Sequence, residues 1–265
     1  MLNDGSIIYK HVVNRQTRQQ FNSQAEHYVT SVAHSSSSSL DLIIELAKDS
    51  KFQTAADIGT GPGFTAFALA ELCDDMIATD ITSNMLHAAA NSIEKKSIDN
   101  ISIGYVDAMQ MSFIDNSLDL ISCRTAAHHF SSVHLFLGEV YRVLKTDGVF
   151  LLSDTTTSEN PFMRNWHQEM EFRRDNTHIR APSPSEWRKE ISQTGFVVQD
   201  ERFTTVDMTF REWVKRSGTP TDEVKKMWDE WLLLPEQIKS EFNVCKTGKD
   251  FSFSWPVYLA RCAKT

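Results

Sequence analysis

The chain has 265 residues, a formal net charge of −8, 41% hydrophobic residues and 23% charged residues, which is an ordinary composition for a globular protein. The net negative charge argues against non-specific binding to nucleic acid, because such binding depends on lysine and arginine neutralising phosphates. Apolar runs last only a few residues, too short to cross a membrane, and the first residues lack the pattern of a signal peptide. We therefore expect a cytoplasmic protein that acts on a small-molecule substrate, without nucleic-acid or membrane partners. The oligomeric state is not indicated.

The positions of the cysteines and of one group of basic residues bear on metal binding and on the surface of the protein. The four cysteines lie far apart and form no CxxC pair, so the spacing of zinc ligands is absent and we expect no metal site. Reduced, mostly buried thiols are the expected state. The inserted region carries a group of basic residues that we interpret as a solvated helix face: Arg173, Arg174, Arg180, Arg188 and Lys189.

The first fifty residues predict two helices. The segment from Arg15 to about Val32 alternates apolar and amide side chains with helical spacing. A serine run at Ser35–Ser39 follows, which we interpret as a capping region rather than a hinge. The second helix is predicted at Leu40–Lys48.

Short apolar strands then alternate with helices. Strands are predicted at Gln53–Ile58, Met76–Thr79, Ile101–Val106, Leu118–Cys123 and Gly148–Ser153. Helices are predicted at Phe64–Leu72, Ser83–Lys95 with Ser83 as the N-cap, and Val133–Val143. This rhythm indicates βαβ units and a parallel sheet that is buried on both faces. Ligands of such sheets bind at the carboxyl ends of the strands.

The regular alternation of predicted strands and helices ends near residue 155. Helices are predicted at Asn160–Arg174, Ser185–Thr194 and Thr221–Leu234, and strands at Phe196–Phe203 and Phe251–Cys262. We expect antiparallel strands here, with the inserted helices lying over the active edge of the sheet.

A glycine-rich turn directly follows the first predicted strand, in the segment Ala56-Asp57-Ile58-Gly59-Thr60-Gly61-Pro62-Gly63-Phe64. Glycines let the backbone approach a ligand that side chains would block, and the next helix begins with free amide donors. The dinucleotide fingerprint needs GxGxxG, whereas the third glycine here comes one place early, which disfavours a dinucleotide-dependent oxidoreductase. The GxGxG spacing, with Asp57 two residues before the first glycine, resembles motif I of class I S-adenosylmethionine-dependent methyltransferases.

Further segments of the chain resemble motifs of the same family. Asp80 ends the second strand about twenty residues after the turn, and Asp107-Ala108 follows the third strand. Residues 113–121 resemble the fourth-strand motif. Glu139 to Gly148 resembles the "E-x-x-R-V-L-K-x-G-G" signature, with Asp147 in place of one glycine. The resemblance covers residues 20–155 well and is strongest to the small-molecule type 11 branch, which is related to ubiquinone and menaquinone biosynthesis methyltransferases.

The resemblance implies a Rossmann-like α/β fold: a seven-stranded, mostly parallel sheet with helices on both faces, an N-terminal helical lid and inserted helices. We expect one methyltransferase domain over residues 1–265, with a lid at 1–50, a cofactor-binding core at 51–155, substrate-side insertions at 156–250 and a final strand at 251–265. The cofactor would be S-adenosylmethionine, with S-adenosylhomocysteine as product. In the family, an acid at the position of Asp80 accepts both ribose hydroxyls, and one at Asp107 holds the adenine amino group. The other cofactor-binding candidates are Asp57, Gly59, Thr60, Gly61, Gly63, Ile81, Met85, Ala108, Arg124, Tyr28 and His34.

The fourth strand runs into a His128-His129 pair, and Asp154 ends the fifth strand. Some sugar and natural-product O-methyltransferases of this branch have the same constellation. By that resemblance, His128 or His129 would be the general base, with Asp154 orienting it or the substrate. A histidine that only packs and bonds backbone is the competing interpretation, and it suits His129 better than His128.

Other chemistry has weaker support. Magnesium-dependent catechol methylation needs a carboxylate cluster, but Arg124 stands where the first acid would be. His167 and His178 are expected at the surface, and the aromatic residues of the insertions are expected to form either a substrate lid or packing. The predicted function is methyl transfer to oxygen, carbon or nitrogen of a small molecule. A protein or RNA methyltransferase and a catalytically silent cofactor-binding protein are the alternatives.

Overall fold

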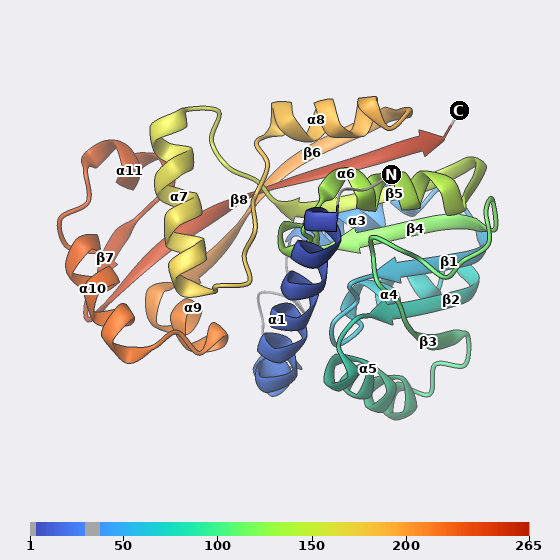
Figure 1. The fold of residues 1–265 in the computed structure, drawn as a ribbon, viewed down its shortest axis with the longest axis horizontal. Helices are drawn as coiled ribbons and strands as arrows, with labels where there is room; N and C mark the ends of the chain where they lie inside the picture. Colours follow the sequence, from blue (N-terminus) through green and yellow to red (C-terminus); the bar gives the residue numbers. More distant parts are fainter. Residues whose placement is uncertain (1–3, 30–37, 265) are drawn as a thin grey trace.

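The computed structural model describes residues 4–29 and 38–264, which form one twisted sheet with helices on both faces (Figure 1). The strand order is β3-β2-β1-β4-β5-β8-β6, which confirms the seven-stranded Rossmann-like fold. Five strands are mutually parallel: β1 (Phe52–Ile58), β2 (Cys73–Asp80), β3 (Ile101–Tyr105), β4 (Leu118–Arg124) and β5 (Leu144–Thr155). Strand β8 (Asp250–Lys264) runs antiparallel to β5 and to β6 (Phe196–Thr209), and the short β7 (Cys245–Thr247) pairs with β8.

The helices follow the predicted order. Two come before the sheet, α1 (Asp4–Val29) and α3 (Ser38–Ala47). Three alternate with the parallel strands: α4 (Phe64–Ala70), α5 (Ser83–Lys96) and α6 (Val133–Val143). The later helices are α7 (Pro161–Arg174), α8 (Pro184–Gln193), α9 (Phe210–Ser217), α10 (Thr221–Trp231) and α11 (Glu236–Glu241). No described helix has the length and apolar character that a membrane crossing needs.

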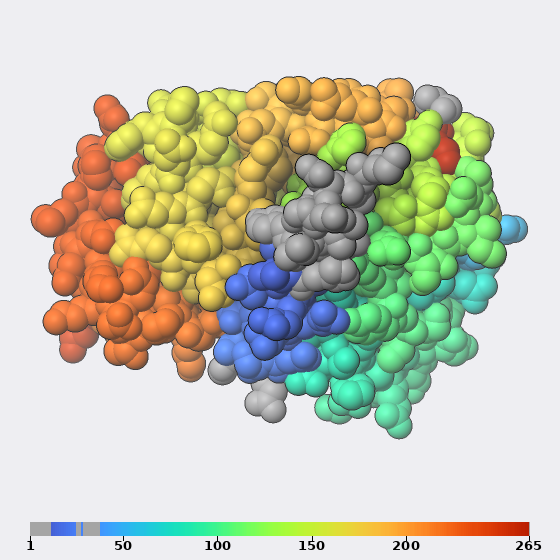
Figure 2. All heavy atoms as spheres, in the orientation of Figure 1, coloured from blue at the N-terminus to red at the C-terminus, as the bar shows by residue number. Residues whose placement is uncertain are grey.

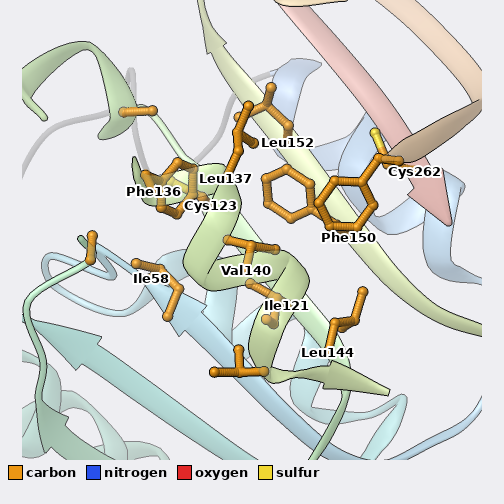
Figure 3. Close-up of a cluster of buried hydrophobic side chains, with 14 of the residues drawn as sticks. Ile58, Ile121, Cys123, Phe136, Leu137, Val140, Leu144, Phe150, Leu152 and Cys262 are labelled. Carbon is orange, nitrogen blue, oxygen red and sulfur yellow. The ribbon is translucent and has the colours of Figure 1, made fainter. Parts of the chain in front are cut away.

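Alternate residues of the parallel strands point to opposite faces of the sheet, so the first hydrophobic cluster, the core of this sheet, has one part on each face. Ile121 and Phe150 pack with Phe136 and Val140 of α6 on one face (Figure 3). Leu120 and the other inward residues of the second face pack against α3 and α4. This two-sided burial explains why the strands are continuous apolar runs, and it confirms the buried parallel sheet.

A second cluster lies where β6 and β8 extend beyond the core sheet. These two strands are long and pair from Phe196↔Lys264 to Thr209↔Ser252. Their far halves carry α7, α9, α10, α11 and β7 (yellow to red in Figure 1). The cluster is rich in buried aromatic rings, including Phe210, Trp213, Trp231, Phe253 and Trp255. Most of the inserted aromatics are therefore core residues, whereas Phe162 and Phe172 are exposed.

Several predicted boundaries were wrong. The N-cap of α5 is Thr82 rather than Ser83, because Oδ1 of Asp80 accepts the N–H of Thr82 and fixes the turn one residue earlier. Strand β6 continues to Thr209 rather than Phe203, because it keeps pairing with β8 as far as Thr209↔Ser252 and packs Val206 and Met208 against the aromatic cluster. The short elements α9, α11 and β7 were not predicted.

Candidate functional site

The first cavity lies at the carboxyl ends of β1, β2 and β4, where ligands of open α/β sheets bind. Its volume is about 890 Å³, counted with the space at its mouth. Most of the residues predicted to contact a cofactor line it: Tyr28, Gly59, Thr60, Gly61, Asp80, Ile81, Met85, Asp107, Ala108 and Arg124. Asp57 and Gly63 lie outside this lining, and His34 falls outside the described residues.

The glycine turn has backbone angles that require glycine. Gly59 has a φ of +70°, and a Cβ there would lie 2.7 Å from Cβ of Ala126. Gly61 has a φ of +52°, and a Cβ there would meet no protein atom within 4 Å. The turn thus presents bare backbone to open space at the cavity, a surface that a ligand can approach closely.

Asp80 joins this turn to the start of α5. Its Oδ2 accepts the N–H of Gly61 at 3.0 Å, and its Oδ1 accepts the N–H of Thr82 at 2.8 Å. Burial raises the pKa of Asp80 above its ordinary value, while the backbone donors work against that rise. Each carboxylate oxygen has a second lone pair, so the side chain can accept further hydrogen bonds from a ligand in the cavity.

Asp57 lies behind the glycine turn, and Arg124 lies beside it. Oδ1 of Asp57 accepts a hydrogen bond from Ser122 at 2.6 Å, and its Oδ2 is buried without a partner among the described residues. Burial raises the pKa of Asp57 to about 6, against the hydrogen bond from Ser122. Arg124 lines the cavity and donates from Nε to Oγ1 of Thr65 at 2.8 Å.

Helix α1 contributes Asn14, Thr17 and Phe21 to the lining of the cavity, and it lies between the core sheet and the inserted elements (Figure 2). Nδ2 of Asn14 donates to Oδ2 of Asp107 at 2.9 Å. Further along the helix, the side-chain amide of Gln20 donates to the carbonyl of Ser217 in α9 at 2.7 Å. Helix α1 therefore links the lining of the first cavity to α9, and its role as a lid stays a prediction.

The second cavity adjoins the first, and Phe21, Tyr28, Thr125 and His129 line both. Its volume is about 670 Å³, again counted with its mouth. His128 and the inner side chains of the second cluster form its wall. A ligand in one cavity can therefore lie next to a ligand in the other.

His128 is held by the fully buried Asp154. Nδ1 of His128 lies 2.6 Å from Oδ1 of Asp154, and the backbone N–H of His128 donates to Oδ2 at 2.9 Å. Because an ionised carboxylate only accepts hydrogen bonds, the proton sits on Nδ1 and Nε2 carries the lone pair. Nε2 has no hydrogen-bond partner among the described residues. Burial disfavours the imidazolium, but Asp154 outweighs this and raises the pKa of His128.

His129 has different surroundings. Its Nδ1 lies 3.0 Å from the carbonyl oxygen of Thr177, so this nitrogen donates to the backbone. Its ring packs edge-on against Phe21, with centroids 4.9 Å apart. Burial, with the neighbouring charge of His128, lowers the pKa of His129 to about 4, so the ring is neutral at physiological pH.

The structure corrects three expectations for the inserted helices. His167, His178 and Arg174 are buried rather than on the surface. His167 and Arg174 face inward because α7 packs against Trp255 of β8 and Trp213 of α9. His178 lies in the loop after α7, where its Nε2 is 2.9 Å from Oε1 of Gln168. One signal was visible in the sequence: Met163, His167, Met170 and Arg174 follow each other at helical spacing and share one face.

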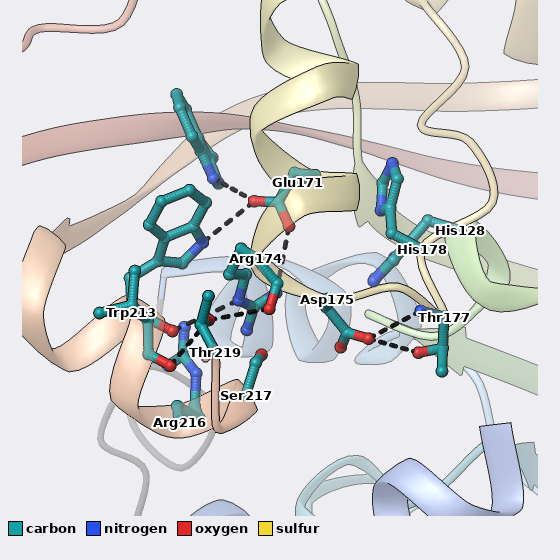
Figure 4. A network of polar contacts seen from close by, with 12 residues as sticks. His128, Glu171, Arg174, Asp175, Thr177, His178, Trp213, Arg216, Ser217 and Thr219 are labelled. Atoms are coloured by element: carbon teal, nitrogen blue, oxygen red, sulfur yellow. Dashed lines mark hydrogen bonds and ion pairs between the residues drawn. The ribbon is translucent and has the colours of Figure 1, made fainter. Parts of the chain in front are cut away.

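A polar network behind this face was not predicted (Figure 4). Oε1 of Glu171 accepts the indole N–H groups of Trp213 and Trp255, and its Oε2 accepts Nη1 of Arg174 at 3.1 Å. Burial opposes the charge of Glu171, but Arg174 and the nearby histidines lower its pKa to about 2. Three of the four cysteines are buried as free thiols, and Cys245 is exposed.

Comparisons with known proteins agree with this geometry. Residues 56–152 match the family model described as "Methyltransferase domain". The chain is 34% identical to the uncharacterised methyltransferase YcgJ of Bacillus subtilis, over 92% of this chain and 97% of that protein. The crystal structure of YcgJ superposes with a TM-score of 0.80 at 32% identity, covering 85% of this chain and 97% of that one.

More distant relatives have named activities. The chain is 33% identical to a demethylmenaquinone methyltransferase of Bacteroides fragilis, over 40% of this chain and 45% of that protein. It is 30% identical to the ubiquinone/menaquinone biosynthesis C-methyltransferase UbiE of Brucella suis, over 45% of this chain and 46% of that protein. With YcgJ matched along nearly its whole length and the glycine turn and Asp80 in place, the chain belongs to the class I S-adenosylmethionine-dependent methyltransferases.

Proposed function

We propose that this enzyme transfers a methyl group to a small-molecule acceptor, with S-adenosylmethionine in the first cavity and the acceptor in the second. The observation that carries the proposal is that the two cavities adjoin, with the buried His128–Asp154 pair at the second. The quinone methyltransferases among the relatives also act on small molecules, which supports this class of acceptor.

The residues of the first cavity fit the cofactor. Asp80 would accept the ribose hydroxyls, and the bare backbone at Gly61 would lie beside the cofactor's main body. Arg124 carries the positive charge that the methionine carboxylate needs, and Asp57, buried next to the glycine turn, would act on the ammonium group through its charge. Asp107 would hold the adenine amino group, with Ala108, Ile81 and Met85 as the apolar wall and Tyr28 on the lid side. When bound, S-adenosylmethionine supplies an activated methyl group.

His128 is proposed as the general base. Asp154 fixes the tautomer that leaves Nε2 with a lone pair, and this nitrogen would take the proton from an oxygen, nitrogen or activated carbon of the acceptor as the methyl group arrives. His129 cannot present Nδ1 in the same way, because that nitrogen already donates to Thr177. We assign it a packing role between α1 and the cavity. Orientation of the two reactants would supply the remaining catalysis.

Residues 1–265 are proposed to act as one methyltransferase domain. Strands β6 and β8 contribute to the core sheet and to the second cluster, and α1 bonds to both parts. The second cavity is therefore built jointly by the core and the inserted elements.

The test uses S-adenosylmethionine with a labelled methyl group and a cell extract divided by ultrafiltration into small molecules and macromolecules. We expect label in the small-molecule fraction with wild-type enzyme. His128→Ala should reduce transfer by about 10²–10⁴-fold. The matched control is His134→Gln, since the side chain of His134 is 65% exposed. Label confined to the macromolecular fraction, or no transfer to either fraction, would contradict the proposal.

A further inference from the structure

Thr125 has a strained backbone at the carboxyl end of β4. Its φ is +55°, in the left-handed region that a β-branched residue rarely adopts. Its N–H still donates to the carbonyl of Ser153 at 2.8 Å, and the chain then turns into a short 3-10 helix at Ala127–His129. Glycine makes such a turn without strain, so the turn alone does not explain a threonine at this position.

The other strained positions have different surroundings. Four more non-glycine residues in the described ranges have a positive φ, namely Ser97, Asn116, Asp147 and Asn243. All four are exposed, and none lines either cavity. Thr125 is instead half-buried and lies at the site. Backbone strain that occurs at a site is a reason to look for a function of the strained residue.

The side chain of Thr125 lies where the two cavities meet. Thr125 lines both of them, and the other described residues shared in this way are Phe21, Tyr28 and His129. Phe21 offers no polar group, and Nδ1 of His129 is bonded to the carbonyl of Thr177. The hydroxyl of Thr125 has no hydrogen-bond partner among residues 4–29 and 38–264. A hydroxyl both donates and accepts, so it can bind either kind of polar group on a ligand.

The shared wall is the place where methyl transfer has to occur. Under the proposed function the methyl donor occupies the first cavity and the nucleophile the second, so the reacting atoms meet beside the residues that line both. His128, the proposed base, follows Thr125 by three residues and lines the second cavity. The base contacts the acceptor through one proton. A second hydrogen bond fixes the rotation of the acceptor group that this first contact leaves free.

We propose that Thr125 positions the methyl acceptor, through a hydrogen bond between its hydroxyl and the polar group of the acceptor at the reacting centre. This rests on the proposed function, because it places the acceptor in the second cavity. A lone pair of the acceptor forms the bond to the methyl carbon, the carbon–sulfur electron pair stays on sulfur, and the acceptor's proton passes to Nε2 of His128. Thr125 exchanges no proton and holds the acceptor in line with the methyl group. The hydroxyl then explains why this strained turn contains a threonine.

Paired substitutions separate the hydroxyl from the shape of the side chain. Thr125→Val keeps the β-branched shape without the hydroxyl, whereas Thr125→Ser keeps the hydroxyl. The measured rate is the initial transfer of labelled methyl from saturating S-adenosylmethionine to the small-molecule fraction of a cell extract. We expect Thr125→Val to be about tenfold slower than wild type, because the acceptor group loses its partner, and Thr125→Ser to stay within about threefold of wild type. Equal rates for the two variants overturn the proposal.

Cofactor affinity is the second measurement. Titration calorimetry with S-adenosylhomocysteine should give the same Kd for the wild type, Thr125→Val and Thr125→Ser. A loss of affinity in Thr125→Val as large as its loss of rate would assign the hydroxyl to the cofactor and overturn the proposal. If Thr125→Val does not fold, Thr125→Ala, which also lacks the hydroxyl, replaces it in both measurements.

Thr125→Gly tests the strain. It should melt at or above the Tm of the wild type, because glycine adopts a positive φ freely, and it should transfer methyl as slowly as Thr125→Val. The matched control is Asp147→Gly, at an exposed residue with a φ of +62°, which should also melt at or above wild type but at an unchanged rate. A lower Tm with a wild-type rate in Thr125→Gly overturns the proposal. Wild-type protein that transfers no label to small molecules would instead refute the proposed function.

Discussion

Asp154 makes two hydrogen bonds to His128: Oδ1 lies 2.6 Å from Nδ1 of the ring, and Oδ2 lies 2.9 Å from the backbone nitrogen of the same residue. The first contact fixes which ring nitrogen carries the proton, and the second fixes where the turn carrying the ring begins. One buried side chain thus sets the tautomer, the orientation and the charge preference of the imidazole.

Replacing Asp154 with Asn should separate charge from orientation. The carbonyl oxygen of Asn can still accept from Nδ1, but the negative charge that raises the pKa of His128 is gone. A general base works in its neutral form, so wild-type activity falls as pH drops through this raised pKa, which lies above 6.5. In Asp154→Asn the acid limb of the kcat profile should move to lower pH, with a lower plateau. Asp99→Asn, an exposed position, is the control. An acid limb that stays in place would rule out His128 as the titrating base.

Asp80→Ala should weaken binding of S-adenosylmethionine. The variant loses the carboxylate that we assign to the ribose hydroxyls and also loosens the glycine turn, whose Gly61 N–H it accepts. Hydrogen bonds to charged groups predict a loss of about ten- to a hundredfold in Kd, measured by titration calorimetry. Asp75→Ala, exposed on the same strand, is the matched control. Similar affinities for the two variants would remove Asp80 from the cofactor site.

Gly59→Ala should disrupt the glycine turn. An added Cβ would lie 2.7 Å from Cβ of Ala126, and the φ of +70° is strained for any residue with a side chain. Strain of this kind costs about 1–3 kcal/mol, so we expect a lower melting temperature and weaker cofactor binding. Gly104→Ala is the control, because its Cβ would meet only side-chain atoms at 3.5 Å or more. Equal melting temperatures and affinities for the two variants would show that the turn tolerates a side chain.

Glu171 should make the fold sensitive to acid. Its folded pKa is about 2 against an ordinary value of 4.5, because the opposing effect of burial is outweighed by Arg174 and nearby histidines. A depressed pKa contributes stability above the unfolded value, and that stability is lost as pH falls from about 4.5 toward 2. The difference corresponds to about 3 kcal/mol in the free energy of unfolding.

Denaturant titrations of Glu171→Gln across this pH range test the assignment. The variant should be less stable than wild type at pH 7, because Arg174 is left buried without its carboxylate. Its stability should also change less between pH 5 and pH 3. Glu169→Gln, on the same helix but largely exposed, should behave like wild type. Parallel pH curves for the wild type and Glu171→Gln would place the acid sensitivity elsewhere.

The sequence predicted the fold and the first cavity because both depend on local patterns. Apolar runs marked the buried strands, and the spacing from Gly59 to Asp80 placed a ligand edge before any tertiary contact was known. The choice between His128 and His129 could not be made in this way. Neighbouring residues on one turn differ here only through their partners, Asp154 and the carbonyl of Thr177, which come from separate parts of the chain.

The burial of Arg174 also could not be predicted from the sequence. Read along the chain, Arg174 belongs to a run of basic residues and indicates a solvated face. Its burial results from the packing of α7 against α9 and from the indoles that converge on Glu171, residues 42 and 84 positions away from that glutamate. The helical spacing of Met163, His167, Met170 and Arg174 marks one face of α7 but does not say which distant residues that face meets, so the second cavity could only be found in three dimensions.

The continuous pairing of β6 with β8 couples the unfolding of the sheet core to the unfolding of the second cluster. Unfolding the second cluster would release the far half of a ladder whose near half forms the edge of the core sheet. The inserted helices therefore cannot melt as an independent unit, and the walls of the second cavity share the cooperativity of the cofactor-binding core. If the second cavity holds the acceptor, as we propose, changes of acceptor specificity would be accommodated most readily in helices α7 and α9, whose side chains line it, rather than in β6 and β8.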